Sequence, residues 1–213
     1  MNNSGFFKRL LAFIIDMIIV SIISSIIYSG LNSIFNFKTT NTENYVKNVE
    51  AITNKFNEID KDNTADMEET YNLISDFSNM TKDNYKDITI EGVPNSLVNF
   101  VVVVLYFIVL AFYLKGQTFG KKLLNIRIVN NDNKPVSVNA LLVRGIILYS
   151  LYSTIVDLIF VFILDNDSYY KLHSVMSGIS FTVMFISFVM IIFNKDKKGI
   201  HDLISKTKVV IDE

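Results

Sequence analysis

Four long runs of apolar residues divide the chain, and polar segments separate them. Each run approaches or exceeds the ~20 apolar residues that carry an α-helix across a hydrocarbon core of about 30 Å. The runs are Leu10–Tyr28, Leu97–Leu114, Ala140–Leu164 and Ser177–Phe193. Half of all residues are hydrophobic, which is too apolar for an ordinary soluble domain. The pattern predicts an all-α membrane protein built as a bundle of four transmembrane helices.

The polar segment between the first two runs, residues 30–96, has a helical pattern of its own. Apolar side chains recur every three or four residues, which is the spacing of an amphipathic helix. They are Tyr45, Val49, Ile52, Phe56 and Ile59, and, after a polar break over Asp60–Thr64, Met67, Tyr71, Ile74 and Phe77. Thr40 and Glu43 are placed as a capping box at the start. We predict an antiparallel helical hairpin outside the membrane. The stripes form its seam, or alternatively bind a protein partner.

The loop between the second and third runs predicts a small β-hairpin. Leu124–Val129 is rich in β-branched residues, Asn130–Pro135 is a turn, and Val136–Val138 returns as a second strand. Near the C-terminus, Thr207–Ile211 is a further strand candidate that could join this hairpin. The glycines at 116 and 120 do not have the spacing of a phosphate-binding loop.

The distribution of charge predicts the orientation. The segment 30–93 holds six Lys against twelve Asp or Glu, whereas 115–139 holds five basic residues and one acidic residue. Short positive loops stay in the cytoplasm. Both termini and the 115–139 loop are therefore expected in the cytoplasm, and residues 30–96 outside it. We expect a multi-pass protein of the bacterial cytoplasmic membrane.

Three charged residues lie within the apolar runs: Asp16, Arg144 and Asp157. A charge at membrane depth costs roughly 2.5–3.5 kcal/mol and often marks a functional site. These residues are therefore candidates for ion binding or proton exchange, with a structural ion pair as the competing explanation. Arg9 and Asp16 are about 10 Å apart along a helix, too far for a direct salt bridge. Because Arg144 lies at a similar depth, we hypothesise that it pairs with Asp16.

Other classes of function find little support in the sequence. There is no Cys, and the two His residues, His173 and His201, are expected on opposite sides of the membrane. We therefore expect no metal site, no cofactor and no enzymatic activity. The basic residues are explained by membrane orientation and anionic headgroups, so no nucleic-acid partner is expected.

Three segments together resemble the RDD family of membrane proteins, which is named for one Arg and two Asp. They are Phe7–Asp16, Gly116–Val129 and Lys198–Val210. The resemblance assigns the family motif to Arg9, Asp16 and Asp202. It covers most of the chain except residues 30–96, which are longer than is common in the family.

The resemblance implies a family of uncertain molecular role in which transport is suspected, with some members described as sodium–proton antiporters. The first hypothesis is therefore a small transporter that exchanges protons for monovalent cations, with Asp16 as the exchanging group and a pathway between protomers of a homo-oligomer. The alternative is a non-transporting accessory, assembly or immunity-type protein that acts through its outer hairpin. Arg9 and Asp202 are expected to form a latch between the tail and the first helix, in preference to a gate.

Overall fold

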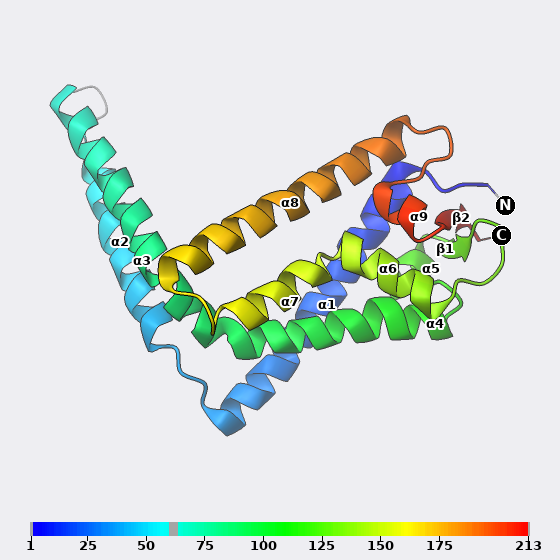
Figure 1. Cartoon of the computed structure of the whole chain (residues 1–213), viewed down its shortest axis with the longest axis horizontal. Helices are drawn as coiled ribbons and strands as arrows, with labels where there is room; N and C mark the ends of the chain where they lie inside the picture. Colours follow the sequence, from blue (N-terminus) through cyan, green and yellow to red (C-terminus); the bar gives the residue numbers. More distant parts are fainter. Residues whose placement is uncertain (1, 60–63, 213) are drawn as a thin grey trace.

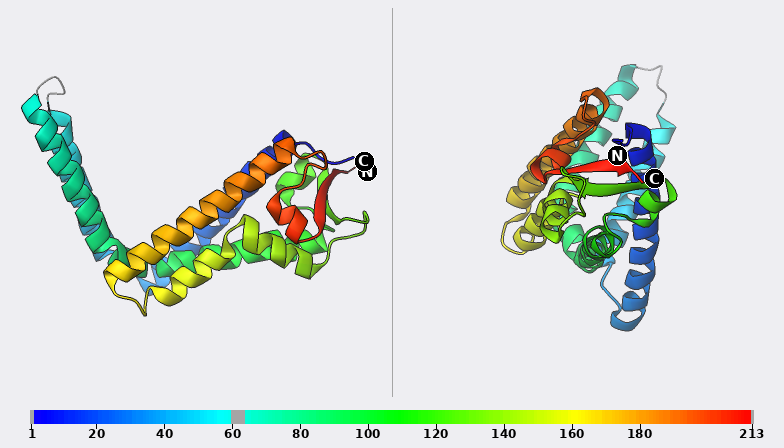
Figure 2. Two further views of the ribbon diagram at one scale, coloured as in Figure 1. Left: turned by 45° about the horizontal axis from the view of Figure 1, so that its top comes forward. Right: turned by 90° about the vertical axis from the view of Figure 1, so that its right-hand side faces the viewer.

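The computed structural model describes residues 2–59 and 64–212, and most of them are helical (Figure 1). The elements are α1 Phe6–Phe35, α2 Thr40–Glu58, α3 Thr64–Val104, η1 Leu105–Leu110, α4 Ala111–Tyr113, α5 Phe119–Leu123, β1 Ile126–Asn130, α6 Val138–Leu148, α7 Leu151–Phe160, α8 Asn166–Phe193, α9 Ile200–Ile204 and β2 Thr207–Ile211. The two strands, α5, α9 and both termini gather at one end of the bundle, here called the sheet end (Figures 1 and 2).

Within the described residues, three helices are long and apolar enough to cross a membrane. They are α1, the continuous helix of 47 residues over Met67–Tyr113, and α8. Helices α6 and α7 make a fourth span if the bent pair is counted as one. Large apolar side chains are exposed along α1 and α8, for example Ile26 and Phe181. Such surfaces suit contact with lipid, so the prediction of a helical membrane protein is confirmed at this level.

The third apolar run is not one straight helix. Helices α6 and α7 meet at an angle of 68°. Ser150, between them, has a left-handed backbone with φ 51°, which interrupts the helical hydrogen bonds. The preceding Tyr149 stacks on Phe107 with ring centroids 3.9 Å apart. The break could not be read from the hydrophobicity of Ala140–Leu164, because both halves are equally apolar.

Helices α2 and α3 pack side by side and stand away from the rest of the bundle (Figures 1 and 2). Glu91 accepts hydrogen bonds from the backbone of Thr42, and Tyr45 bonds to Thr81. Partner numbers fall in α3 as they rise in α2, so the two helices are antiparallel. The polar break predicted between them covers Asp60–Thr64; residues 60–63 lie outside the described residues, and α3 begins at Thr64.

The second apolar run does not begin a new helix, because α3 continues from the outer segment into it. The helix changes direction between its outer and apolar parts (Figure 1), and Pro94 lies within it. Proline removes a backbone donor and clashes with the preceding turn, which accounts for a bend here. The apolar part then widens into the π-helix η1.

The predicted β-hairpin is wrong, although the strand candidates at Leu124–Val129 and Thr207–Ile211 both form, as β1 and β2. Strand β1 pairs antiparallel with β2, with Ile128 opposite Val209. The segment expected to return as a strand, Val136–Val138, instead begins α6, where the Ser137 hydroxyl accepts a hydrogen bond from the Ala140 amide. Only an isolated bridge joins Val129 to Pro135 within the described residues.

Candidate functional site

The carboxylate of Asp16 is completely buried on α1, where four hydrogen-bond donors surround it. The Tyr106 hydroxyl and the Gly120 amide each donate to Oδ1 over 2.7 Å, and the Thr118 hydroxyl donates to Oδ2 over 2.5 Å. The ammonium of Lys121 lies 3.5 Å from Oδ2. These hydrogen bonds compensate the cost of burying the two polar oxygens.

A glycine permits this arrangement. A Cβ atom at Gly120 would lie 2.4 Å from the Ala12 carbonyl oxygen and 2.8 Å from Asp16 Oδ1. No side chain fits at that distance, so glycine is required for α5 to approach α1. Another glycine, Gly116, has φ +91°, a backbone conformation that favours glycine. A Cβ atom there would lie 2.0 Å from the Ile128 carbonyl oxygen. Both glycines of the 116–129 motif therefore serve close backbone packing.

The buried partner of Asp16 is Lys121, and the hypothesis that Arg144 fills this role is wrong. Lys121 also donates to the Thr118 hydroxyl over 3.1 Å and lies 5.7 Å from the centre of the Phe107 ring. Burial lowers the pKa of Lys121 to about 8, and the Asp16 carboxylate opposes this shift. In the sequence, Lys121 differs from the other basic residues of the 115–139 loop only by its position directly after Gly120.

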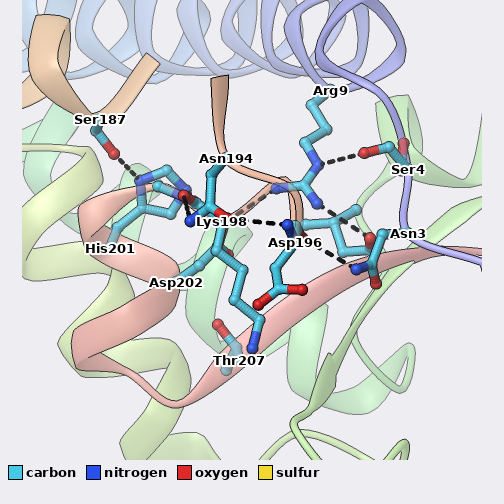
Figure 3. A network of polar contacts seen from close by, with 12 residues as sticks. Asn3, Ser4, Arg9, Ser187, Asn194, Asp196, Lys198, His201, Asp202 and Thr207 are labelled. Carbon is cyan, nitrogen blue, oxygen red and sulfur yellow. Dashed lines mark hydrogen bonds and ion pairs between the residues drawn. The ribbon is translucent and has the colours of Figure 1, made fainter. Parts of the chain in front are cut away.

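Arg144 is paired with Asp202. Asp202 also binds Arg9 (Figure 3). One carboxylate oxygen of Asp202 contacts the Arg144 guanidinium. The other accepts from Arg9 over 2.9 Å and from the Gly199 amide over 3.1 Å. Burial alone would raise the pKa of Asp202, but the guanidinium groups of Arg144 and Arg9 hold that pKa far below its ordinary value. The expected contact between Arg9 and Asp202 is thus present, with Arg144 as a third member.

The Arg9 guanidinium also binds two backbone carbonyls. It donates to the Ser4 oxygen over 3.2 Å and to the Val209 oxygen over 3.1 Å (Figure 3). Arg144 in turn donates to the Thr207 hydroxyl over 3.2 Å. Arg9, Arg144 and Asp202, here called the ion triad, therefore join α1, α6, α9 and β2. A latch between the tail and the first helix requires such a connection.

His201 is almost fully buried beside the triad. Its Nδ1 lies 2.6 Å from the Ser187 hydroxyl, and its Nε2 lies 3.5 Å from the Asp202 carboxylate. Burial and the nearby Arg144 charge lower the pKa of His201 to about 3, so the imidazole is neutral at ordinary pH. The sequence gives no sign that His201 is buried, because its burial depends on the packing of α8 against α9.

Asp157 lies at the other end of the bundle and is not brought to this site. Its carboxylate is 3.1 Å from Nδ1 of His173 on α8. The two side chains border a cavity of about 170 Å³ together with Tyr169. Of the charged candidates from the sequence, Arg9, Asp16, Arg144 and Asp202 therefore lie at the sheet end, and Asp157 lies at the opposite end of the bundle.

The sequence comparisons agree with this arrangement. The model of the RDD family matches residues 4–206. The chain belongs to the RDD family. It is also 31% identical over 209 residues to an uncharacterized protein, YxaI of Bacillus subtilis (strain 168), covering 97% of this chain and 96% of that protein. No solved structure matches.

In this RDD protein, the three motif residues divide between two buried clusters at the sheet end. Arg9 and Asp202 belong to the ion triad, whereas Asp16 binds the α5 segment. Both clusters connect segments far apart in the sequence. The motif therefore holds the ends of the chain and the 116–129 segment against the bundle.

Replacement of Asp16 by Asn should lower the free energy of unfolding by about 3–5 kcal/mol, because it leaves the Lys121 ammonium buried without its counter-ion. The added change Lys121→Met should restore most of the loss. The matched control, Asp16→Asn with Arg144→Gln, should not, since Arg144 belongs to Asp202. Unfolding of the purified protein in detergent, followed by circular dichroism, measures all three. Recovery of stability in the Asp16→Asn, Arg144→Gln double variant, without recovery in the Asp16→Asn, Lys121→Met double variant, would contradict the pairing.

Acid should destabilise the protein through His201. The unfolded histidine takes up a proton as the pH falls through about 6.5, whereas the folded one does so only near pH 3. The contribution of the neutral His201 to the free energy of unfolding is therefore fully present above pH 6.5. Below that pH, and down to about pH 3, the free energy of unfolding falls by up to about 1.4 kcal/mol per pH unit. Between pH 7 and pH 5, we expect Tm to fall less in His201→Asn than in the wild type. In His173→Asn, Tm should fall as much as in the wild type. An unchanged slope in His201→Asn would refute the assignment.

Proposed function

We infer that this RDD protein is a membrane-anchored binding protein that uses α2 and the outer half of α3 to hold a protein partner outside the bacterial cytoplasmic membrane. In this proposal the sheet end and both termini lie in the cytoplasm. The positive 115–139 loop and the acidic 30–93 segment support that orientation. The buried ion clusters keep the membrane part together and take no direct part in binding.

The observation that carries the proposal is an apolar stripe on α3 that α2 covers only in part. Its members are Met67, Tyr71, Ile74 and Phe77, with 67%, 73%, 56% and 40% of their surfaces exposed. Two stripe members, Ile74 and Phe77, also line a groove of about 240 Å³ between α2 and α3, together with Ile52, Phe56 and Leu73 among others. Contiguous exposed apolar surface outside a membrane marks an interaction site more often than a free surface.

The charge around the stripe indicates what kind of protein would bind. Between residues 30 and 93 there are six Lys against twelve acidic residues. Glu68 and Glu69 lie on α3 between Met67 and Tyr71 of the stripe and are exposed. A partner with an apolar centre and a basic rim is complementary to this surface.

Proton-for-cation exchange at Asp16 has less support. A carboxylate that exchanges a proton for a cation needs free oxygen lone pairs facing a path for ions. Both oxygens of Asp16 already accept hydrogen bonds, and Lys121 already supplies the positive charge. A latch explains these contacts without a moving ion.

The topology predicts which single cysteines react from outside the cell. The chain has no Cys, so each variant carries one thiol only. A membrane-impermeant maleimide should label Glu50→Cys on intact cells, and should label Asp132→Cys and Lys195→Cys only after permeabilisation. All three positions are exposed. Labelling of Asp132→Cys on intact cells would refute the orientation.

The stripe should contact the partner directly. A photo-crosslinking amino acid at position 74 should give an adduct with one defined protein in cells, and the same probe at Asn79, exposed on the opposite face of α3, should not. Reversing charge with Glu68→Lys and Glu69→Lys should reduce the adduct at least fivefold if the partner has a basic rim.

Two outcomes would contradict this prediction. An adduct of twice the mass of this chain means that a second copy covers the stripe. Equal adducts at 74 and 79, or none at either, mean that the stripe has no partner. Cation-dependent proton movement in inverted vesicles that disappears in Asp16→Asn, with protein levels equal, would then favour exchange.

A further inference from the structure

A small cavity lies at the sheet end between α1, α6 and α8, beside both buried clusters. Its volume is about 40 Å³, whereas one water needs about 10–15 Å³. Three cationic side chains line it, from Arg9, Lys121 and Arg144. Much of the remaining wall is apolar and includes Phe6, Phe13 and Phe188.

The charges around this cavity do not balance. Arg9, Lys121 and Arg144 are positive, and among the described residues that contact them the carboxylates are those of Asp16 and Asp202. The neighbouring imidazole is neutral, as described above. One positive charge is therefore left over in a site where Arg144 is 5% exposed and Lys121 is 8% exposed. A buried charge without a counter-ion is costly, so the site favours a bound anion.

An unused donor lies in the same wall. The Nε of Arg144 is buried and has no hydrogen-bond partner in the described part of the chain. The Lys121 ammonium has three N–H groups and donates to two acceptors, Asp16 and Thr118. A guanidinium edge beside an ammonium is a typical environment for a carboxylate or phosphate group.

The apolar part of the wall indicates how such an anion arrives. Phe188 on α8 meets Phe6 and Phe13 on α1 edge-on, at centroid distances of 6.1 and 6.4 Å. Phe6 and Ile191 also line a second, larger groove of about 460 Å³ on the surface of the sheet end, together with Phe7 and Ile192. The cationic cavity and this mainly apolar groove, which Lys8 and Lys197 also line, therefore share Phe6 and Ile191 as lining residues.

We propose that this cavity binds the oxyanion headgroup, a carboxylate or a phosphate monoester, of an acyl-chain amphiphile taken from the membrane. The headgroup accepts hydrogen bonds from Arg144 Nε and the Lys121 ammonium. The alkyl chain passes Phe6 and lies in the neighbouring groove of about 460 Å³. The site is separate from the stripe on α3, so it does not depend on the proposed protein partner.

The test uses the full chain purified in an uncharged detergent, with dodecyl phosphate and oleate as probes. Inorganic phosphate, acetate and dodecyltrimethylammonium are tested in parallel. Native mass spectrometry and the shift in Tm report binding. We expect both chain-bearing anions to bind and to raise Tm, and the three other compounds to bind at least tenfold more weakly.

Two variants test the position of the site. Leu148 lines the cavity, so Leu148→Phe should fill it and weaken dodecyl phosphate binding about tenfold with every charge retained. Arg144→Lys keeps the charge beside Asp202 but removes Nε, and should weaken binding similarly. Leu142→Phe on the exposed side of the same helix is the matched control and should bind as the wild type does. The Tm of each variant without ligand checks folding.

Three results would overturn the proposal. Equal binding of inorganic phosphate or acetate would mean that the site takes a free anion and no amphiphile. Equal binding of the cationic amphiphile would mean that the alkyl chain alone drives association. Unchanged binding in Leu148→Phe, with that variant folded, would place the ligand elsewhere on the protein.

Discussion

The carboxylate of Asp202 lies between two guanidinium groups, and the sheet end depends on this ion triad. Taking three charges out of water costs several kcal/mol per ion, and only full hydrogen bonding makes the cost tolerable. Here Arg9 also binds two backbone carbonyls, and Asp202 also caps the first turn of α9. The contacts that satisfy these charges come from α1, α6, α9 and β2. The charges can thus be satisfied only when segments from both ends of the chain are in place.

The second cluster applies the same constraint to the middle of the chain. Asp16 draws the 116–129 segment onto α1 through a backbone amide, a hydroxyl and an ammonium. The approach is close enough that Gly120 cannot carry a side chain. Directly after α5, β1 pairs with β2, which the Arg9 guanidinium also contacts. The two clusters therefore hold opposite sides of one small assembly, and loss of either would loosen the other.

The sequence predicted those features that follow from local pattern. Apolar runs indicated the spanning helices, and the three- and four-residue spacing indicated the amphipathic faces of α2 and α3, because both depend on residues that are neighbours along a helix. It did not predict the break at Ser150, since a left-handed residue leaves no mark in hydrophobicity. It also placed Arg144 with the wrong acid. Equal depth in a membrane does not fix how a helix is rotated, and a connecting segment, α5, supplied Lys121 in its place.

The surplus of positive charge at the sheet end limits what can enter it. Two unit charges about 4 Å apart interact by about 4 kcal/mol at an effective dielectric constant near 20. A sodium ion at Asp16 would lie close to the Lys121 ammonium, which is 3.5 Å from Oδ2, and it would have to displace hydrogen-bond donors, since each carboxylate oxygen already accepts from two. An anion in the adjoining cavity would instead gain from the same cations and use the free Nε of Arg144. The charges that hold the chain together thereby favour an anionic ligand, and they oppose the cation exchange that a lone buried carboxylate would otherwise indicate.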